Sequence, residues 1–577
     1  MQNAEIAVAL DDVADLLELK ESNPFHVRAY RTAARTVESL SRPVAAIIQA
    51  GEDLAELPGV GARISAHLKE LVETGRLGVL EDLRGQLPPG IIELTRIQGL
   101  GPKKAILLAQ QLGVATVADL ESAILDGRLA GVRGFGEKSA AKLLEAIAAS
   151  TEAQGRLLRT TAAQLLVGIL KWTNDAPGAL EIAVAGSFRR GVETVRDIDL
   201  LVRAEGDGTP VVQHFTDFPG AVRVEAAGST RGSVILRSGF QVDLRVVPTE
   251  SWGAALHYFT GSKEHNVRMR QRARRRGLKV SEYGVFREDT AERVAGASEE
   301  EVFAALGLDF IPPELREDRG EIAAAAEGRL PKLVHHRDLK GDLQMHSTWS
   351  DGRFSIEEMA LDCRDRGYEY LAMTDHSGGA LTMVNGLTAE RAHAQWAEID
   401  EVRGRVPGIT ILKSMEIDIL KDGSLDVDAE TLAGLDLVLV SVHSFMKMDR
   451  EAMTERVIRA LRHPKVDILG HPTGRNLSRR PPFAIDMEAV LQVAKEQDVA
   501  VEINASPNRL DLSDVHAFRA RELGVKIVIS TDAHTRQELD NMRYGIEQAR
   551  RAWCEPGDIL NTRPWEEFRA WLQRRRG

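Results

Sequence analysis

The sequence is poor in cysteine and has no long hydrophobic segment. Only Cys363 and Cys554 occur among 577 residues, which argues against a disulfide framework and indicates a reducing compartment. No stretch approaches the roughly 18–20 apolar residues of a membrane-spanning helix. Near the N-terminus, Asp11, Asp12 and Asp15 stand where a secretory signal would have a basic and then an apolar segment. We therefore expect a cytoplasmic protein with no membrane partner.

Basic residues are outnumbered by acidic residues overall but are concentrated in one segment. The formal net charge of −12 argues at first against a nucleic-acid partner. However, residues 1–300 carry only −2, whereas residues 301–577 carry −10. The stretch 263–279 holds eight basic residues and one acidic residue. This stretch is either a solvated helix face or a surface for an anionic polymer, and the acidic C-terminal half suits divalent cations.

The spacing of apolar residues divides the chain into three regions. Residues 1–155 have helical spacing broken by Gly and Pro, which predicts an all-helical region. From 180 onward, strand-like runs precede a helical segment, which predicts an α/β domain. From 341 onward, beyond a charged alanine-rich linker, short apolar strands alternate with amphipathic helices. This alternation predicts a parallel sheet, either open or closed into a barrel. The predicted strands are 181–185, 199–202, 233–236 and 241–247, and then 370–373, 409–412, 435–442, 466–469, 499–503 and 526–529.

Three segments of the helical region share one pattern, in which Gly-apolar-Gly opens a helix. Glycine lets the backbone approach a phosphate closely, and a helix N-terminus directs unpaired N–H groups toward it. Such a contact positions DNA without reading its bases. The repeated pattern resembles the helix-hairpin-helix DNA-binding motif, although the third copy fits a purely structural turn equally well. The glycines are Gly59 and Gly61, Gly99 and Gly101, and Gly134 and Gly136.

A cluster of carboxylates is predicted in the α/β domain. The segment GSFRRG at 186–191 precedes Asp197 and Asp199, which share one face of a strand because side chains alternate along it. Asp243 lies on another predicted strand and completes the cluster if the two strands are neighbours. Three carboxylates suit two Mg²⁺ or Mn²⁺ ions about 3.5–4 Å apart, an arrangement that promotes phosphoryl transfer. The alternative is a solvated strand end with unrelated acids.

The block that follows narrows the function. Tyr258-Phe259-Thr260-Gly261-Ser262 precedes Asn266 and Arg270. Together with GSFRRG, this block resembles the family X DNA polymerases, over roughly residues 1–317. The resemblance implies that Asp197, Asp199 and Asp243 are catalytic and hold metal. It further implies a site for a deoxynucleoside triphosphate formed by Ser187, Arg190, Tyr258, Phe259, Gly261 and Asn266, with Arg270 on the template strand.

The first glycine pair lies where family X polymerases have their lyase subdomain. Members that remove a 5′-deoxyribose phosphate form a Schiff base through a lysine in the following helix. Here His67 occupies that position, and Lys69 lies two residues later. Because a neutral imidazole does not form this adduct, we expect no lyase activity by that route.

The C-terminal region carries a series of metal-competent residues, most of which directly follow apolar segments. One histidine after a strand is more often structural, but the repetition favours a site for Zn²⁺, Mn²⁺ or Fe²⁺. The series resembles the PHP (polymerase and histidinol phosphatase) domain, a distorted (β/α)7 barrel that holds up to three metals. The implied ligands are Gln344, His346, Glu416 and Asp532 for one metal, Glu416, His443 and His471 for a second, and Asp351, His376 and His534 for a third.

Two of these positions depart from PHP relatives. Gln344 stands where many relatives have histidine, and a neutral amide weakens the first site because it is a poorer ligand. Asp351 replaces a histidine of some phosphatases and favours harder ions such as Mn²⁺ at the third site. The resemblance implies a Mn²⁺-dependent 3′–5′ exonuclease or a related 3′-end processing activity. A catalytically silent scaffold and a phosphatase of small phosphomonoesters remain as alternatives.

Together with these observations, the two resemblances imply a multidomain protein that fills short gaps in base excision repair of DNA and processes 3′ ends. Its fold class combines an all-α helix-hairpin-helix region, an α/β nucleotidyltransferase palm with a thumb, and a C-terminal distorted (β/α)7 barrel. We expect gapped or nicked double-stranded DNA and deoxynucleoside triphosphates as partners, and a monomeric protein. The expected boundaries are 1–82 and 83–155 for two helical subdomains, 156–248 for the palm, 249–317 for the thumb, 318–338 for a linker and 339–577 for the PHP domain.

Overall fold

The computed structural model divides the chain into two compact units. The first comprises residues 1–156 with 238–240, and the second comprises residues 157–237 and 241–577. Among the described residues, no helix is both long and apolar enough to cross a membrane. The structure describes all residues except 1–2, 21–22, 39–43, 58, 86–93, 95–99, 101, 133–134, 137–139, 141–142, 145–155, 379–384, 478–479 and 577.

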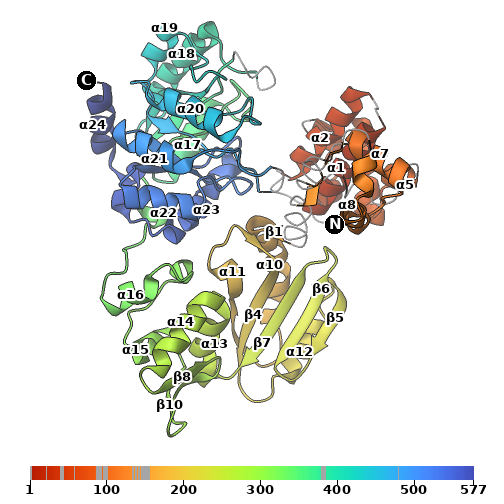
Figure 1. Ribbon diagram of the computed structural model, residues 1–577. Helices are drawn as coiled ribbons and strands as arrows, with labels where there is room; N and C mark the ends of the chain where they lie inside the picture. The colour runs from red at the N-terminus through yellow and green to blue at the C-terminus, as the bar shows by residue number, and fades with distance from the viewer. Residues whose placement is uncertain are drawn as a thin grey trace. The chain divides into compact units, whose positions relative to one another are not determined.

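The first unit contains helices and turns, and no strand, in its described part. Apolar residues three or four apart, such as Leu10, Val13 and Leu16, are buried in one cluster to which each helix contributes. This confirms the predicted all-α N-terminal region. In chain order the elements are α1 (Asn3–Leu19), α2 (Pro24–Glu38), α3 (Val44–Gln49), η1 (Leu54–Glu56), α4 (Ala62–Thr74), α5 (Gly78–Gly85), α7 (Pro102–Leu112), α8 (Val117–Leu125) and η2 (Arg128–Gly131) (Figure 1).

The palm region of the second unit is built on a five-stranded sheet in the order β2-β4-β7-β6-β5. Strands β4 and β7 are parallel, and the other neighbours are antiparallel. Helices α10 and α12 are joined where Trp172 Nε1 donates a hydrogen bond to the carbonyl of His214 at 2.7 Å. The elements are β1 (Leu157–Leu158), α10 (Arg159–Asn174), β2 (Ala179–Val184), α11 (Gly186–Arg189), β3 (Thr194–Val195), β4 (Asp197–Ala204), α12 (Thr209–Thr216), β5 (Ala221–Ala227), β6 (Arg231–Leu236) and β7 (Gln241–Val247).

Strand β5 is absent from the sequence prediction, whereas the four predicted strands of the palm are all found. The reason is its position at the edge of the sheet. Val222 is 60% exposed and Val224 is 49% exposed, so the strand has no alternation between buried apolar and exposed polar residues. A pattern search that relies on such alternation overlooks strands of this kind.

The thumb region follows the palm and packs three helices against a small antiparallel sheet of order β10-β9-β8. A buried ion pair fixes it to the palm, because Glu299 accepts hydrogen bonds from Arg316 Nη1 at 2.6 Å and from Arg189 Nη2 at 2.7 Å. The predicted linker at 318–338 also contains a short helix. The elements are η3 (Thr249–Ser251), α13 (Trp252–Thr260), α14 (Lys263–Arg274), β8 (Leu278–Ser281), β9 (Gly284–Arg287), β10 (Arg293–Ala295), α15 (Glu299–Ala305), η4 (Pro313–Leu315) and α16 (Glu321–Ala326).

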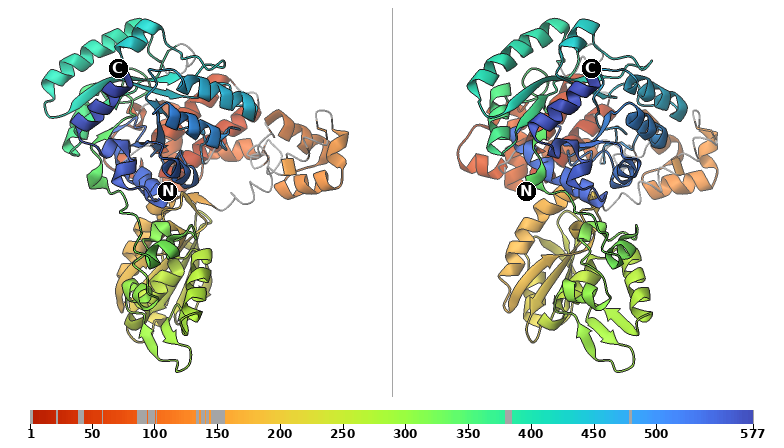
Figure 2. Two further views of the ribbon diagram at one scale, coloured as in Figure 1. Left: turned by 60° about the vertical axis from the view of Figure 1, so that its left-hand side comes forward. Right: turned by 90° about the vertical axis from the view of Figure 1, so that its left-hand side faces the viewer.

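The C-terminal region forms a barrel of seven parallel strands, arranged in chain order from β11 to β17. A parallel bridge between Met345 and Ala533 joins the first strand to the last. Helices lie outside the strands in both views of Figure 2, which confirms the predicted (β/α)7 barrel. The strands are β11 (Gly341–Asp342), β12 (Tyr370–Met373), β13 (Thr410–Asp418), β14 (Leu437–Ser441), β15 (Ile468–Leu469), β16 (Ala500–Asn504) and β17 (Ile527–Ser530). The helices are α17 (Ile356–Asp365), α18 (Ala389–Arg405), α19 (Ala429–Gly434), α20 (Arg450–Leu461), α21 (Met487–Glu496), α22 (Asp514–Leu523), α23 (Met542–Arg551) and α24 (Trp565–Arg576).

Alternation along the barrel strands separates two cores. In β12, Tyr370 and Ala372 belong to one apolar cluster, while Leu371 and Met373 belong to another. The first cluster also contains Trp571 and other residues of α24, so this helix packs against one side of the strands. Polar residues then gather where the strands end at their carboxyl termini, as expected for a parallel βα barrel.

Ion pairs join the palm to the barrel within the second unit. Arg475 donates hydrogen bonds from Nη1 and Nη2 to the two carboxylate oxygens of Glu193, at 3.1 and 2.7 Å. The Arg475 side chain is 10% exposed and that of Glu193 is 26% exposed. This bidentate pair connects the loop after GSFRRG to the loop after β15.

Two glycines provide a test of this packing. A Cβ at Gly253 would lie 1.9 Å from the backbone carbonyl carbon of Ser298, so Gly253→Ala should destabilise the second unit by about 1–3 kcal/mol through overpacking. A Cβ at Gly168, in α10, would meet no atom closer than 3.9 Å. Gly168→Ala should therefore stabilise the second unit by about 0.5–1 kcal/mol, because alanine favours the helical conformation more than glycine does. Thermal unfolding of both variants measures the two shifts, and shifts of the same sign would contradict the packing described.

Candidate active sites

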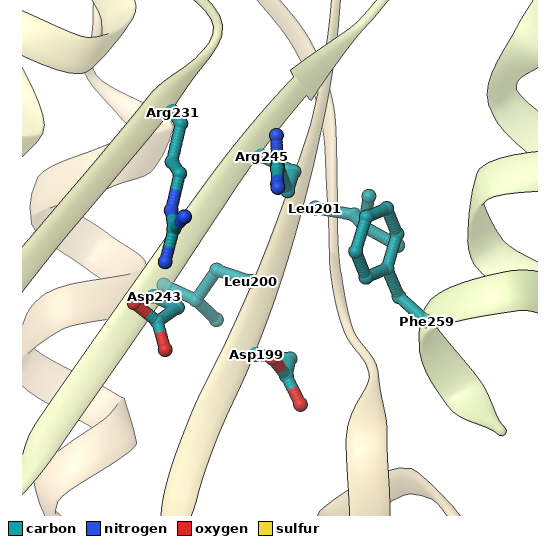
Figure 3. A pocket seen from close by; sticks show the side chains of 7 residues that line it. All are labelled: Asp199, Leu200, Leu201, Arg231, Asp243, Arg245 and Phe259. Atoms are coloured by element: carbon teal, nitrogen blue, oxygen red, sulfur yellow. The ribbon is translucent and has the colours of Figure 1, made fainter. Parts of the chain in front are cut away.

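The palm brings two of the three predicted carboxylates into direct register. Asp199 on β4 pairs with Asp243 on β7, and residues paired in adjacent strands project to the same face. Asp197 precedes Asp199 by two residues in the same strand and therefore shares that face. Figure 3 shows the carboxylates of Asp199 and Asp243 side by side on neighbouring strands.

The glycine that opens the GSFRRG segment is required by this cluster. Gly186 has φ of +62°, in the left-handed region that favours glycine. A Cβ at this position would lie 2.2 Å from Oδ2 of Asp199. Any side chain here would therefore displace the carboxylate, so the glycine allows the turn and the aspartate to meet.

The environment of these carboxylates favours a bound cation. Burial, followed by repulsion from Asp197 and Asp243, raises the pKa of Asp199 to about 7, although Arg190 acts in the opposite direction. Asp243 Oδ2 accepts a hydrogen bond from Gln241 Nε2 at 3.0 Å, whereas its Oδ1 is buried without a partner among the described residues. An orphaned oxygen beside a crowded carboxylate fits a divalent metal ion.

A small cavity adjoins the carboxylates. Its volume is about 100 Å³, and Asp199, Asp243 and Phe259 line it together with two arginines (Figure 3). The arginines, Arg231 and Arg245, are paired across β6 and β7 and were missed in the sequence. Arg245 lies two residues after Asp243, so the same strand alternation indicates its place, whereas Arg231 belongs to no recognisable motif.

The predicted nucleotide-binding residues of the thumb lie near the GSFRRG turn. Arg190 Nη1 donates a hydrogen bond to the carbonyl of Thr260 at 2.5 Å. A Cβ at Gly261, where φ is +70°, would lie 3.2 Å from the same nitrogen. Asn266 Nδ2 donates to the carbonyl of Tyr258 at 2.7 Å. The structure thus brings Arg190, on the palm, next to the thumb turn.

The remaining predicted residues of this site are also placed. Ser187 lies in α11, in the same turn as Arg190. The rings of Tyr258 and Phe259 meet edge to face, with centroids 5.2 Å apart. Arg270 is exposed on α14, where the basic stretch 263–279 begins.

In the barrel, one buried carboxylate contacts four histidines. Glu416 lies near the end of β13, which continues well past its predicted end at 412. Its carboxylate oxygens lie close to an imidazole nitrogen of each histidine. The distances from Glu416 are 3.4 Å to His346 Nε2, 3.4 Å to His376 Nδ1, 3.1 Å to His443 Nε2 and 2.8 Å to His471 Nε2.

Three groups of side chains in the barrel have the spacing of a metal site. Their arrangement differs in detail from the three predicted sets, because His346 also joins the group around Asp351, and His376 also joins the group around Glu416. His471 contacts Glu416 but falls outside the three groups. The groups are His346, Asp351, His376 and His534; His376, Glu416 and His443; and His346, Glu416 and Asp532.

Unsatisfied buried atoms show that these residues fit metal ions. His346 Nδ1, His376 Nδ1 and His443 Nε2 are buried without a hydrogen-bond partner among the described residues. Two candidate ligands also have strained backbones, since φ is +26° at His471 and +55° at Asp532. Strain of this kind persists where the surroundings enforce it, which is common at functional sites.

Gln344 has one side-chain atom suited to a metal. The residue is fully buried, and its Nε2 donates a hydrogen bond to Asp532 Oδ1 at 3.3 Å. Its Oε1 is buried without a partner among the described residues. The amide oxygen is therefore the atom available to a cation, as the weaker ligand that the sequence indicates.

Neighbouring groups hold the candidate ligands, and the sequence analysis did not identify them. Ser441 Oγ donates a hydrogen bond to Glu416 Oε1 at 2.6 Å, and Asp418 accepts one from the backbone N–H of His443 at 2.8 Å. Arg509 Nε lies 3.4 Å from Asp532 Oδ2, which places a cation beside the cluster. A lone arginine in a loop gives no signal in the sequence, whereas Asp418 lies two residues after Glu416 on the same strand face.

The first of the three predicted phosphate-binding turns lies mostly within the described part of the helical unit. Gly59 has φ of +74°, and a Cβ there would lie 2.4 Å from Thr32 Cγ2, so it is required by the fold itself. Gly61 is the N-cap of α4, with open space around it, which leaves the start of this helix accessible. Gly136 also has open space around its Cα. Gly99, Gly101 and Gly134 lie outside the described residues.

His67, which occupies the position expected for a lyase lysine, contacts Tyr30 within the helical unit. Tyr30 Oη and His67 Nδ1 are 3.0 Å apart, and the two rings stack with centroids 5.9 Å apart. Burial lowers the pKa of His67, with a smaller opposing effect from Glu70. The imidazole is therefore neutral at physiological pH.

Comparison with known proteins identifies the chain. It is 39% identical over 576 residues to "DNA polymerase/3'-5' exonuclease PolX" of Bacillus subtilis (strain 168), and the match covers 100% of both chains. The chain belongs to the PolX family. Family models match a helix-hairpin-helix domain at 1–77, a SAM-like helix-hairpin-helix tandem at 91–149, a DNA polymerase beta thumb at 255–317 and a PHP domain at 342–506.

The C-terminal region of this PolX family member is also similar to shorter proteins. A probable phosphatase of Thermoanaerobacter sp. (strain X514) is 30% identical over 234 residues, which covers 38% of this chain and 89% of that protein. A probable phosphatase of Shewanella sp. (strain MR-4) is 30% identical over 234 residues, covering 39% and 87%. The PHP barrel is thus similar to proteins that consist of little else.

The crowding of the palm carboxylates predicts a pH-dependent stability. The pKa of Asp199 is about 7 in the folded protein and 3.8 in an unfolded chain, so the stability that its protonation provides is lost as the pH rises through this range. In a chelator, Asp199→Asn should therefore unfold at a higher temperature than the wild type above pH 7. Thermal unfolding across pH should show the difference growing between about pH 4 and pH 7. A difference independent of pH would contradict the assigned cause.

Metal analysis tests the barrel cluster. Glu416→Gln removes the carboxylate shared by two of the three groups and should lower the Mn²⁺ content after dialysis. Glu488→Gln is the matched control. Glu488 lies on α21 and forms an exposed ion pair with Arg519 of α22, so its replacement should leave the Mn²⁺ content unchanged. Equal metal loss in both variants would show a general disruption of the barrel.

Proposed function

We propose that this protein fills short gaps during base excision repair of DNA and trims the 3′ end with its PHP domain. The proposed activities are those of a DNA-directed DNA polymerase and a Mn²⁺-dependent 3′–5′ exonuclease. The observation that carries the proposal is the presence of two separate carboxylate-based sites on one chain that is similar to PolX of Bacillus subtilis over its full length. Removing an unsuitable 3′ nucleotide and then adding the correct one requires both chemistries at the same 3′ end.

In the palm, we assign nucleotide addition to Asp197, Asp199 and Asp243. These residues would hold Mg²⁺ or Mn²⁺, which supplies Lewis-acid chemistry at the transferred phosphate. Arg190 and Ser187, in the turn that Gly186 places against Asp199, bind the triphosphate.

The thumb residues orient the remainder of the nucleotide. Phe259 borders the cavity beside Asp199, so Tyr258 and Phe259 are assigned to the sugar and to the exclusion of ribose. Gly261 belongs to the same turn, Asn266 contacts the base, and Arg270 contacts the template.

In the barrel, the candidate ligands would hold two or three Mn²⁺, Zn²⁺ or Fe²⁺ ions, which supply hydroxide near neutral pH. Glu416 is the shared carboxylate between groups, while Asp418 and Ser441 keep His443 and Glu416 in place. Arg509 is suited to contact an anionic phosphate at the rim of the cluster. The proposed ligand set is Gln344, His346, Asp351, His376, Glu416, His443, His471, Asp532 and His534.

The substrate follows from the same assignments. We propose gapped or nicked double-stranded DNA, bound through the glycine turns of the helical unit and the basic stretch 263–279, with deoxynucleoside triphosphates as the second substrate. Cytoplasmic location and a monomeric state complete the proposal. The proposed division is 1–82 and 83–155 for the helical subdomains, 156–248 for the palm, 249–317 for the thumb, 318–338 for the linker and 339–577 for the PHP domain.

The second candidate function keeps the polymerase but makes the PHP domain a silent scaffold. Gln344 favours this alternative, because it offers a weaker donor than histidine at a central position. The two candidates differ in metal content, since a scaffold has no need of tightly bound transition metal.

A gapped-DNA assay separates the two activities. A 5′-labelled primer in a one-nucleotide gap, with Mn²⁺, should lengthen when the complementary nucleotide is present and shorten when it is absent. Asp243→Ala should abolish lengthening and keep shortening, and Glu416→Gln should do the reverse. Lengthening alone in the wild type would support the silent scaffold. Loss of trimming with retained addition in Asp243→Ala would show that the sites are wrongly assigned.

A further inference from the structure

Helix α23 of the barrel region lies against the palm turn that carries Arg190. The carbonyl of Arg190 accepts a hydrogen bond from Arg551 Nη1 at 2.9 Å. At Gly191, the next residue of the turn, a Cβ would lie 3.6 Å from Arg551 Cδ and 3.6 Å from Glu547 Cβ. The hydrogen bond thus places α23 directly against the turn, and the space at Gly191 would take little more than a methyl group.

The side chains of Arg190 and Arg551 share one carboxylate. Glu317 Oε1 accepts a hydrogen bond from Arg190 Nε at 3.0 Å and from Arg551 Nη1 at 2.8 Å. These side chains are 14%, 17% and 6% exposed for Arg190, Glu317 and Arg551, so little water screens their charges. Nη2 of Arg190 has no protein partner among the described contacts, which leaves it for a ligand.

The surrounding charges continue this pattern. Asp514 accepts a hydrogen bond from Arg551 Nη2 at 2.8 Å and forms an ion pair with Arg319 Nη2 at 2.9 Å. Three arginines thus surround two carboxylates, and the group retains one positive charge. Without Arg551, Glu317 would form its ion pair with Arg190 alone.

The titration of Glu317 agrees with this arrangement. Burial alone would raise the pKa of this carboxyl, but the guanidinium groups of Arg190 and Arg551 outweigh it and hold the pKa below its ordinary value. Glu317 is therefore charged at physiological pH and competes with any anionic ligand for Arg190.

Other residues of α23 fix the orientation of the helix on the palm and linker. Glu547 forms an ion pair with Arg159, which begins α10. Gln548 Nε2 donates a hydrogen bond to Glu193 Oε2 at 3.5 Å, and Arg550 Nε donates one to Glu314 Oε1 at 2.7 Å. Arg551 thus projects from a helix that is held at several points.

We propose that Arg551, on the barrel helix α23, is a positioning residue for nucleotide binding in the palm. Arg551 shares the carboxylate of Glu317 with Arg190 and binds the backbone carbonyl of Arg190. Glu317 therefore neutralises Arg190 less completely, and Arg190 attracts the triphosphate of the incoming nucleotide more strongly. The barrel region therefore contributes a charge to the polymerase site. This inference rests on the triphosphate-binding role proposed for Arg190.

The test compares two neighbouring arginines in the full-length protein. Arg551→Met should raise the KM for the complementary deoxynucleoside triphosphate in one-nucleotide gap filling roughly tenfold, the size expected when a charge-assisted hydrogen bond is lost. The kcat at saturating nucleotide should change little. Arg550→Met, on the same helix and bound to Glu314 instead of Glu317, should leave both constants nearly unchanged, because the contacts of Glu547 and Gln548 still hold α23 on the palm.

A second variant distinguishes charge from general disruption. In Arg551→Met/Glu317→Gln, no carboxylate neutralises Arg190, so the KM should return toward the wild-type value. Arg551→Lys should show a smaller rise than Arg551→Met. If Arg551→Met does not fold, Glu317→Gln alone and Arg551→Lys still decide the matter, and a rise in KM for Glu317→Gln would overturn the inference.

Arg190→Gln separates failure of this inference from failure of the proposed site. An increased KM in Arg190→Gln, with an unchanged KM in Arg551→Met, would reject the role of Arg551 alone. An unchanged KM in Arg190→Gln would reject the triphosphate role of Arg190 and the inference with it. Retained 3′ trimming in Arg551→Met, measured on the same DNA without nucleotide, should show that the barrel remains folded.

Discussion

Both sites depend on carboxylates that the fold holds out of water. In the palm, parallel strands place Asp199 opposite Asp243, and burial with mutual repulsion raises the pKa of Asp199 to about 7. In the barrel, burial would lower the pKa of His443, but Glu416 and Asp418 outweigh it and raise that pKa to about 9. In the palm, the repulsion between the aspartates is relieved only when a proton or a metal ion binds. In the barrel, histidine side chains surround the buried carboxylate of Glu416.

Much of this arrangement could be predicted from the sequence, because strand periodicity carries direct geometric information. Asp197 and Asp199 had to share a face, and six predicted strands alternating with helices had to form a parallel sheet, to which the structure adds the two-residue strand β11. The edge strand β5 could not be found in this way, because its valines face solvent. The role of Gly186 beside Asp199 could not be predicted from the sequence of the turn alone, because it depends on how the turn folds against the strand.

The details of the metal groups lay beyond the sequence for a different reason. Which histidine lies near which carboxylate depends on loop paths and side-chain rotamers, so the contact of His376 with Glu416 could not be read from spacing. Arg509 and Arg231 carry no motif. The contact between Arg551 and Glu317 joins residues 234 positions apart, and only the packing of α23 on the palm brings them together.

The pair formed by Glu193 and Arg475 bears on how such a chain can change over generations. It links a loop beside the nucleotide turn to the loop that follows His471, and breaking it leaves a partly buried lone charge at a cost below the roughly 3–5 kcal/mol of a fully buried pair. Replacing either partner alone would leave this mismatch, and a matching uncharged substitution at the other position would remove it.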